Sequence, residues 1–112
     1  MIDECGFGYI IIDGKRYTND VIVFPGRVED NWWRKVGHQL QVKDLEVLVE
    51  EKPEVLVIGT GYNGLMKISS ETVEFLRSEG VEPIIQETRD ACRTYNNLVE
   101  SKKVVAALHL AC

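Results

Sequence analysis

A glycine-rich hexapeptide is the strongest chemical motif in this chain. Residues 59–64 read Gly-Thr-Gly-Tyr-Asn-Gly, match the pattern GxGxxG and directly follow a predicted buried strand. In dinucleotide-binding proteins such glycines let the backbone approach a pyrophosphate, which lies at the N-terminus of the following helix. Here the next helix is predicted to begin only at Ser69 or Ser70. The acidic residue after the next strand, Glu87, follows Gly59 by 28 positions rather than about 20. The pattern therefore favours a structural turn over a dinucleotide site.

The carboxyl ends of two predicted strands form a candidate binding rim. Gly59, Thr60 and Gly61 end one strand, and Thr88 and Arg89 begin the helix after another. Ligands of open α/β sheets usually bind beyond the carboxyl ends of the strands. Two hydroxyls, a guanidinium and the free N–H groups of a helix start would suit a small anion or a nucleotide. The alternative is that Thr88 only caps its helix.

The direction of the last predicted strand decides what else reaches this rim. If that strand is antiparallel to its neighbours, it brings Lys102 and Lys103 to the rim and makes it locally positive. If it is parallel, it brings His109 and Cys112 instead. The structural alternative for the two lysines is a favourable position near a helix C-terminus.

The remaining reactive side chains do not form a catalytic constellation. Cys92 lies near a predicted helix start, where a thiolate is stabilised, but it shares an apolar stripe with Tyr95 and is expected to be a buried structural thiol. His38 and His109 lack the spacing of a metal site, and the three cysteines contain no CxxC pair. We expect no catalytic residue, no metal, no cofactor and no disulfide framework.

Two adjacent tryptophans form a candidate interface. Trp32 and Trp33 would point to opposite faces if they lay in a strand. One could enter the core, and the other would need cover. Because aromatic residues are enriched in protein interfaces, this pair suggests a contact with a protein partner or with a second copy of the chain. Packing within the N-terminal β structure is the alternative.

Length and charge narrow the classes of partner. The chain has 112 residues, which predicts a single domain over residues 1–112. Its net charge is −5, from 13 basic and 18 acidic residues, so neither nucleic acid nor an anionic membrane surface is an expected partner. No apolar run approaches the ~20 residues of a spanning helix, and the start of the chain does not resemble a targeting signal. We expect a cytoplasmic location.

The hydrophobic patterns alternate between strands and helices after a β-rich first third. Asp13-Gly14 is a strong hairpin signal after the β-rich run 7–12, and residues 21–24 form a second run. Helices are predicted from about Asp44, from Ser69 or Ser70, and over about 89–101. Buried strands are predicted over 55–58 and 104–110, and a strand over 81–86 with Pro83 marking it as an edge. This order predicts an α/β fold with a β-rich N-terminal section.

Three segments in this order resemble a known family. They are VLVIGTG at 55–61, TRDACRTYN at 88–96 and VVAAL at 104–108. The chain resembles the adipogenesis-associated-domain family of small uncharacterised archaeal and bacterial proteins, whose relatives include a mitochondrial complex I assembly factor. The resemblance implies three layers around a mixed sheet of about five strands, with the last strand antiparallel to the others and a small β element at one side.

The functional expectation follows from the resemblance and from the missing catalytic set. We expect a non-catalytic assembly, regulatory or protein-interaction module. The alternative is a small-molecule binding protein, or an enzyme, that uses the Gly59-Thr60-Gly61 turn and the Thr88-Arg89 helix start.

Overall fold

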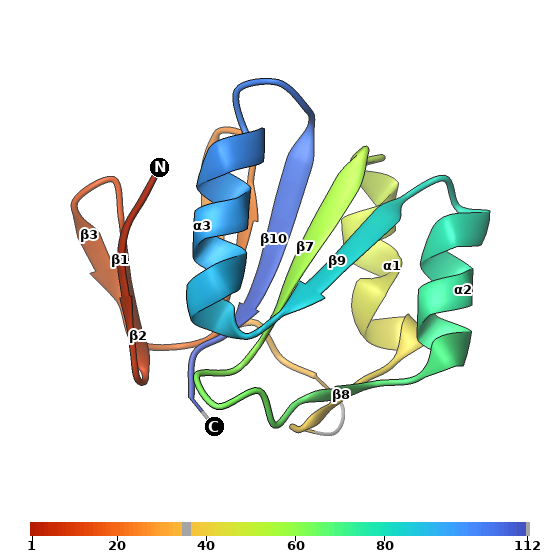
Figure 1. Ribbon diagram of the computed structural model, residues 1–112, viewed down its shortest axis with the longest axis horizontal. Helices are drawn as coiled ribbons and strands as arrows, with labels where there is room; N and C mark the ends of the chain where they lie inside the picture. Colours follow the sequence, from red (N-terminus) through yellow and green to blue (C-terminus); the bar gives the residue numbers. More distant parts are fainter. Residues whose placement is uncertain (35–36, 112) are drawn as a thin grey trace.

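The computed structural model describes residues 1–34 and 37–111. Its centre is a five-stranded sheet in the order β5-β4-β10-β7-β9 (Figure 1). The strands of this sheet are β4 (Val21–Phe24), β5 (Arg27–Asp30), β7 (Val55–Thr60), β9 (Glu82–Gln86) and β10 (Val104–His109). Every residue of β7 and of β10 is buried, as expected for strands that are covered on both faces.

The direction of the last strand corrects one prediction. β10 pairs in parallel with β7, and β7 pairs in parallel with β9. Only β4, on the other side of β10, runs antiparallel to it. The physical reason is the crossover: α3 (Thr88–Leu98) returns the chain to the amino-terminal edge of the sheet, so β10 starts where β7 and β9 start. The sheet is mixed because of β4 and β5, not because of the last strand.

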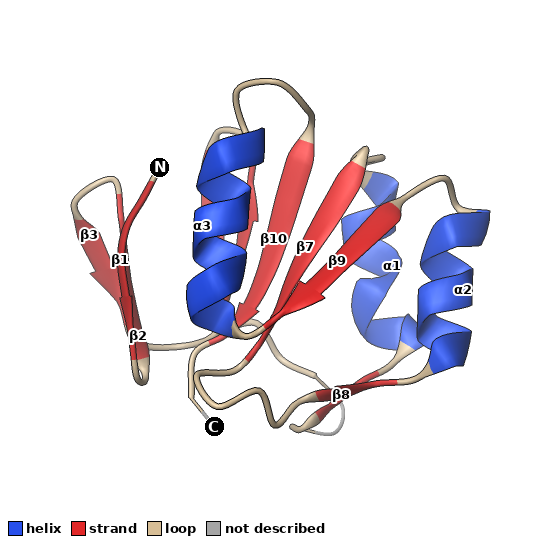
Figure 2. Ribbon diagram, viewed as in Figure 1, coloured by secondary structure: helices blue, strands red, loops and turns tan. Residues whose placement is uncertain are grey.

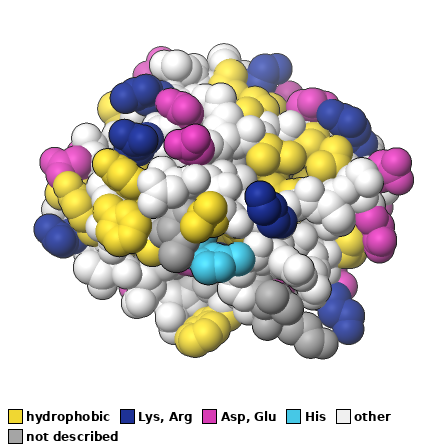
Figure 3. All heavy atoms as spheres, turned by 60° about the horizontal axis from the view of Figure 1, so that its bottom comes forward, with side chains coloured by type: hydrophobic (Ala, Val, Ile, Leu, Met, Phe, Trp, Pro, Cys, Tyr) yellow, Lys and Arg dark blue, Asp and Glu magenta, His cyan; other side chains and the backbone are white. Residues whose placement is uncertain are grey.

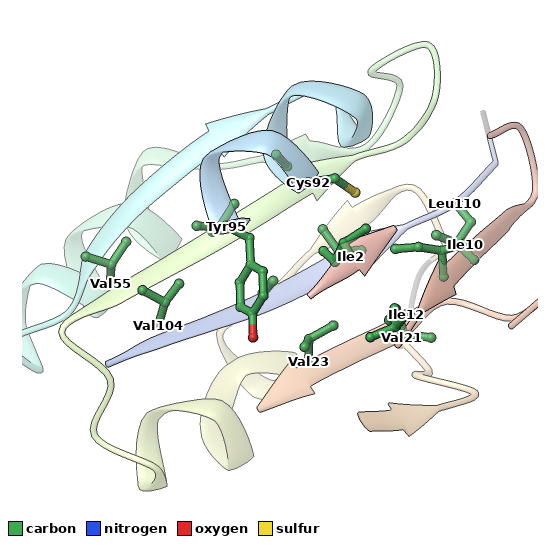
Figure 4. Close-up of a cluster of buried hydrophobic side chains, with 14 residues drawn as sticks. Ile2, Ile10, Ile12, Val21, Val23, Val55, Cys92, Tyr95, Val104 and Leu110 are labelled. Carbon is green, nitrogen blue, oxygen red and sulfur yellow. The ribbon is translucent and has the colours of Figure 1, made fainter. Parts of the chain in front are cut away.

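Helices cover both faces of the central sheet (Figure 2). One face carries α1 (Val42–Glu50) and α2 (Ser70–Ser78), and the other carries α3. α1 and α2 contribute Leu45, Leu48 and Leu76 to one buried cluster. α3 contributes Ala91, Cys92 and Tyr95 to the other (Figure 4), so the single apolar stripe predicted for this helix does face the core. The expected three layers are present.

The N-terminal β element is a separate three-stranded antiparallel sheet. It consists of β1 (Ile2–Gly6), β2 (Tyr9–Ile12) and β3 (Lys15–Tyr17) in that order. Its inner residues Ile2, Ile10 and Ile12 pack into the same cluster as α3. The Asn96 side chain fixes this contact, since it accepts from the Ile2 N–H at 2.9 Å and donates to the Ile2 carbonyl at 2.8 Å.

The observed helix starts differ in how closely they match the starts predicted from the sequence. Ser69 caps α2 and accepts from the Thr72 N–H at 3.2 Å, as predicted. α1 begins after Gln41, and Asp44 lies in its first turn rather than at its cap. α3 begins after Glu87, which corrects the assignment of Thr88 as the cap. The starts of α1 and α2 are held side by side by a short parallel ladder of β6 (Gln39–Leu40) and β8 (Lys67–Ile68).

Candidate functional site

The Gly59-Thr60-Gly61 turn is tied to the start of α3 by its own backbone groups. The Gly61 N–H donates to Thr88 Oγ1 at 2.9 Å, and the Thr88 N–H donates to the Gly61 carbonyl at 3.1 Å. Thr88 Oγ1 in turn donates to the His109 carbonyl at 2.5 Å. The Thr60 hydroxyl donates to the Gln86 carbonyl at 3.1 Å. These bonds occupy the Gly61 and Thr88 amides and both threonine hydroxyls, so the geometry favours the structural interpretation of the motif.

Glycine is required in this motif for steric and conformational reasons. A Cβ on Gly59 would lie 2.7 Å from Thr88 Oγ1 and 2.9 Å from Leu108 Cδ2. Gly61 and Gly64 have φ values of 111° and 73°, a region that side chains other than glycine rarely adopt. The pattern GxGxxG therefore serves close packing of β7 against α3 and β10, followed by a left-handed turn.

The other predicted rim residues are divided between the two edges of the sheet. The Arg89 guanidinium lies at the carboxyl edge, 4.4 Å from the centre of the Tyr62 ring and 4.0 Å from a Glu87 carboxylate oxygen. Lys102 and Lys103 lie at the opposite edge, because they precede the start of the parallel strand β10. The Lys103 N–H donates to Glu54 there at 2.8 Å. The two lysines therefore do not join the rim.

The parallel alternative instead brings His109 to the carboxyl edge, where it meets two residues that sequence reasoning missed. His109 Nδ1 lies 2.8 Å from Asp20 Oδ2, and Arg34 Nη2 lies 2.8 Å from the same oxygen. Asp20 Oδ1 accepts from the Leu110 N–H at 2.8 Å, and Arg34 Nε donates to the Gly37 carbonyl at 2.9 Å. We call Asp20, Arg34 and His109 the edge cluster. Cys112, the other residue of that alternative, lies outside the described residues.

The edge cluster is largely buried and charged. The side chains of Arg34, His109 and Asp20 are 5%, 9% and 18% exposed. Burial by itself would raise the pKa of Asp20, but the hydrogen bonds from His109, the Leu110 amide and Arg34 outweigh it and lower that pKa below its usual value. Asp20 is therefore a carboxylate at neutral pH, and it holds both the Arg34 guanidinium and the His109 ring within hydrogen-bond distance.

A cavity of about 420 Å³ opens beside the edge cluster. Its lining comes from the segment between β3 and β4 and from the residues after β5: Thr18, Asn19, Asp20, Asn31, Trp32, Trp33, Arg34 and Gly37. The Arg34 guanidinium lies 4.7 Å from the centre of the Trp32 ring. No short motif could have indicated this site, because Asp20, Arg34 and His109 are 14 and 75 positions apart in the chain.

The same edge of the sheet carries exposed apolar side chains. Phe7, Leu65 and Trp33 are 59%, 51% and 78% exposed, and the Phe7 and Tyr62 rings meet edge to face at 5.6 Å. Figure 3 looks onto this edge and shows hydrophobic side chains and one histidine side chain at the surface. We call Phe7, Tyr62, Leu65 and Trp33 the carboxyl-edge face.

Backbone contacts place the segments that carry Phe7, Leu65 and Trp33 at one edge. The Trp32 N–H donates to the Asp20 carbonyl at 2.8 Å, which holds the tryptophan pair beside the edge cluster. The Gly8 N–H donates to the Leu110 carbonyl at 3.0 Å, which fixes the turn with Phe7 beside the end of β10. The Met66 N–H donates to the Thr60 carbonyl at 2.9 Å, which holds Leu65 near the end of β7. Of the tryptophan pair, Trp32 is half-buried against Arg34 and Trp33 is exposed. The two side chains therefore differ in solvent exposure, although neither residue lies in a strand.

Two classes of feature are missing from the described residues. Among the helices that the structure describes, none is long and apolar enough to cross a membrane. Within residues 1–34 and 37–111, no group of three or more His, Cys, Asp or Glu side chains is arranged to hold a metal ion.

The fold belongs to a known class of protein. A family model described as a protein of unknown function (DUF498/DUF598) matches residues 2–109, and the chain belongs to this family. It is similar to a conserved hypothetical protein from Pyrococcus horikoshii, with 28% identity, a TM-score of 0.85 and coverage of 100% of this chain and 99% of that one. It is also similar to a Bordetella parapertussis protein, with 30% identity, a TM-score of 0.81 and coverage of 96% and 92%.

Curated relatives extend the family to animals. They are named NADH dehydrogenase (ubiquinone) 1 alpha subcomplex assembly factor 3. The zebrafish protein is 35% identical over 99 residues, which are 86% of this chain and 55% of that protein. The human protein is 28% identical over 109 residues, which are 95% of this chain and 58% of that protein. The chain thus spans little more than half the length of these relatives.

Proposed function

We propose that this chain is a protein-interaction module of the assembly or regulatory kind, which holds a partner protein on the carboxyl-edge face. The observation that carries the proposal is the convergence of Phe7, Tyr62, Leu65 and Trp33, from three separate segments, at one edge of the sheet. Exposed apolar patches with polar surroundings are typical of interaction sites. Large aromatic side chains contribute most of the energy in many protein interfaces.

The names of the curated relatives support the same kind of function. Those proteins are named as assembly factors, and an assembly factor acts by contact with other proteins. The geometry of the Gly59-Thr60-Gly61 turn gives no comparable support to the alternative of a nucleotide or anion site at Thr88 and Arg89, since the turn and Thr88 are bonded to each other.

Co-purification with matched variants tests the proposal. A tagged full chain is recovered from its own cells, and the proteins that accompany it are quantified for the wild type, for Phe7→Ser with Leu65→Ser, and for Val47→Ser. Val47 is a matched control because it is 56% exposed on α1. We expect defined partners to be lost at least tenfold from the double variant and retained by Val47→Ser.

Two outcomes would contradict the proposal. One is partners that are retained equally by the double variant and the wild type. The other is a wild-type chain that is recovered alone and is monomeric by light scattering at the same concentration. A dimer that the double variant abolishes would identify the partner as a second copy of the chain.

A further inference from the structure

An irregularity in β1 turns the Cys5 side chain to the inner face of the N-terminal sheet. In the pairing of β1 with β2, Ile2 lies opposite Ile12. The register then shifts between Ile2 and Glu4, so that Cys5 lies opposite Ile10. In a regular strand, residues three positions apart point to opposite faces. Because the extra residue of a bulge reverses this alternation, Ile2 and Cys5 share the face on which Ile10 and Ile12 are buried.

The helix α3 presents Cys92 to this inner face, one turn before Asn96. The Asn96 side chain is bonded to both backbone polar groups of Ile2, which fixes β1 along the helix. Residues four positions apart lie on the same side of a helix, so Cys92 also faces β1. Cys5 packs against the buried cluster that contains Cys92, and in Figure 4 the Cys92 sulfur points to the side on which Ile2 and Ile10 lie. The two sulfurs meet there, and the Cys92 thiol donates a hydrogen bond to the Cys5 sulfur.

The two thiols differ in access and in acidity. Cys5 is half-buried and Cys92 is buried. The hydrogen bond from Cys92, followed by the positive charge of Arg89, lowers the pKa of the Cys5 thiol, although burial acts in the opposite direction. The thiolate is the form that reacts with oxidants. Cys5 is therefore the thiol that an oxidant reaches first, and Cys92 is already in contact with it as the second thiol.

We propose that Cys5 and Cys92 form an oxidation site, which hydrogen peroxide converts into a disulfide between β1 and α3. The bridge would tie the N-terminal sheet covalently to the helix that it packs on. This inference goes beyond the proposed function, because it concerns the contact between the N-terminal sheet and α3 and needs no partner protein.

The reaction proceeds in two steps. The Cys5 thiolate sulfur attacks one oxygen of hydrogen peroxide, so that an S–O bond forms, the O–O bond breaks and hydroxide leaves. The Cys92 sulfur then attacks the sulfur of the Cys5 sulfenic acid. The S–S bond forms, the S–O bond breaks, and the departing hydroxide takes the Cys92 proton and leaves as water. In total, two thiols are oxidised to one disulfide and one peroxide is reduced to two molecules of water.

Mass spectrometry of the oxidised chain tests the proposal. The full chain with Cys112→Ser, which retains only Cys5 and Cys92, is treated with hydrogen peroxide in native buffer and digested without reduction. We expect two peptides joined through Cys5 and Cys92 as the main oxidised product, and dithiothreitol should separate them. The oxidised chain should also unfold at a higher urea concentration than the reduced chain, because the bridge closes a long loop. When Cys92→Ser is added, Cys5 should stop at the sulfenic acid, which dimedone traps.

Moving the first thiol by one residue provides a matched control. Glu4 is exposed and precedes Cys5 on β1, so Cys5→Ser with Glu4→Cys keeps a cysteine on the strand but directs it to the outer face. A disulfide needs closely placed and suitably directed Cβ atoms, so this variant should form at least about tenfold less of the bridge. The proposal is overturned if Cys5 of the folded parent chain stays reduced or is oxidised without the bridge. It is also overturned if the control variant forms the bridge equally, or if the bridge does not raise the urea midpoint.

Discussion

Thr88 Oγ1 donates to the His109 carbonyl at 2.5 Å and accepts from the Gly61 N–H at 2.9 Å. One buried hydroxyl thus joins the start of α3 to the ends of β7 and β10. The same residue that looked like a helix cap or a ligand contact in the sequence is a link between three elements of the core. This link sets the position of the carboxyl edge, on which the proposed function depends.

Removing the Thr88 hydroxyl is expected to destabilise the fold. Thr88→Val keeps the shape of the side chain but leaves the Gly61 N–H and the His109 carbonyl without their buried partner. The expected loss is about 2–4 kcal/mol in the free energy of unfolding. Urea denaturation measures it. Thr88→Ser is the control, since it retains the hydroxyl and should lose about 1 kcal/mol; equal stability of the Val and Ser variants would contradict the role of the hydroxyl.

A methyl group at position 59 should also be costly. In Gly59→Ala the new Cβ would lie 2.7 Å from Thr88 Oγ1 and 2.9 Å from Leu108 Cδ2, so β7 and α3 must separate. We expect about 1–3 kcal/mol of destabilisation by thermal or urea unfolding. Gly37→Ala is a matched control because a Cβ at position 37 would meet no atom within 4 Å, and it should change stability by less than about 0.5 kcal/mol. Similar losses for both variants would argue against close packing as the reason for Gly59.

The contacts of Asp20 in the edge cluster predict that its contribution to the free energy of unfolding depends on pH. The pKa of Asp20 is lower in the fold than its ordinary value, which is about 3.9. Its contribution to stability is therefore complete above that value and is lost as the pH falls through the lower, folded pKa. Asp20→Asn should cost about 3 kcal/mol at pH 7, because it leaves the buried Arg34 charge uncompensated.

Urea denaturation of both proteins at several pH values checks this prediction. The difference in unfolding free energy between the wild type and Asp20→Asn should shrink as the solution is made more acidic than the ordinary Asp pKa of about 3.9. A difference that is constant from pH 7 into this acidic range would mean that the Asp20 charge does not contribute.

The two described cysteines should differ in reactivity. A hydrogen bond with the Cys92 thiol lowers the pKa of the half-buried Cys5 thiol, whereas the same contact and burial raise the pKa of Cys92. Because the thiolate is the reactive form, iodoacetamide should modify Cys5 well before Cys92 in a Cys112→Ser background. Mass spectrometry of digested samples gives both rates. Modification of Cys92 at the rate of Cys5 in the folded protein would refute this order.

Much of the fold is predictable from local patterns. The continuous apolar run from Val55 and the run from Val104 identify the two buried central strands, and Pro83 identifies β9 as an edge. Ser69 marks the start of α2 because its side chain satisfies a free N–H of the first turn. In each case the signal and its physical cause lie within a few residues of each other.

The residues of the edge cluster could not be predicted from such local patterns. Whether β10 runs parallel or antiparallel to β7 depends on where α3 returns the chain, and no residue within β10 records it. That one choice exchanges Lys102 and Lys103 for His109 at the carboxyl edge. Asp20 and Arg34 then meet His109 only through the order of strands in the sheet, so no spacing in the sequence marks the edge cluster.

Site-specific photo-crosslinking is the most direct test of the central claim that the carboxyl-edge face holds a partner protein. A photoreactive amino acid replaces Leu65 in one variant and Val47 in another, both exposed in the free chain, and each is activated in the cells that make the protein. The account predicts a defined crosslinked product from position 65 and none from position 47. Equal crosslinking from both positions, or none from position 65, would contradict it.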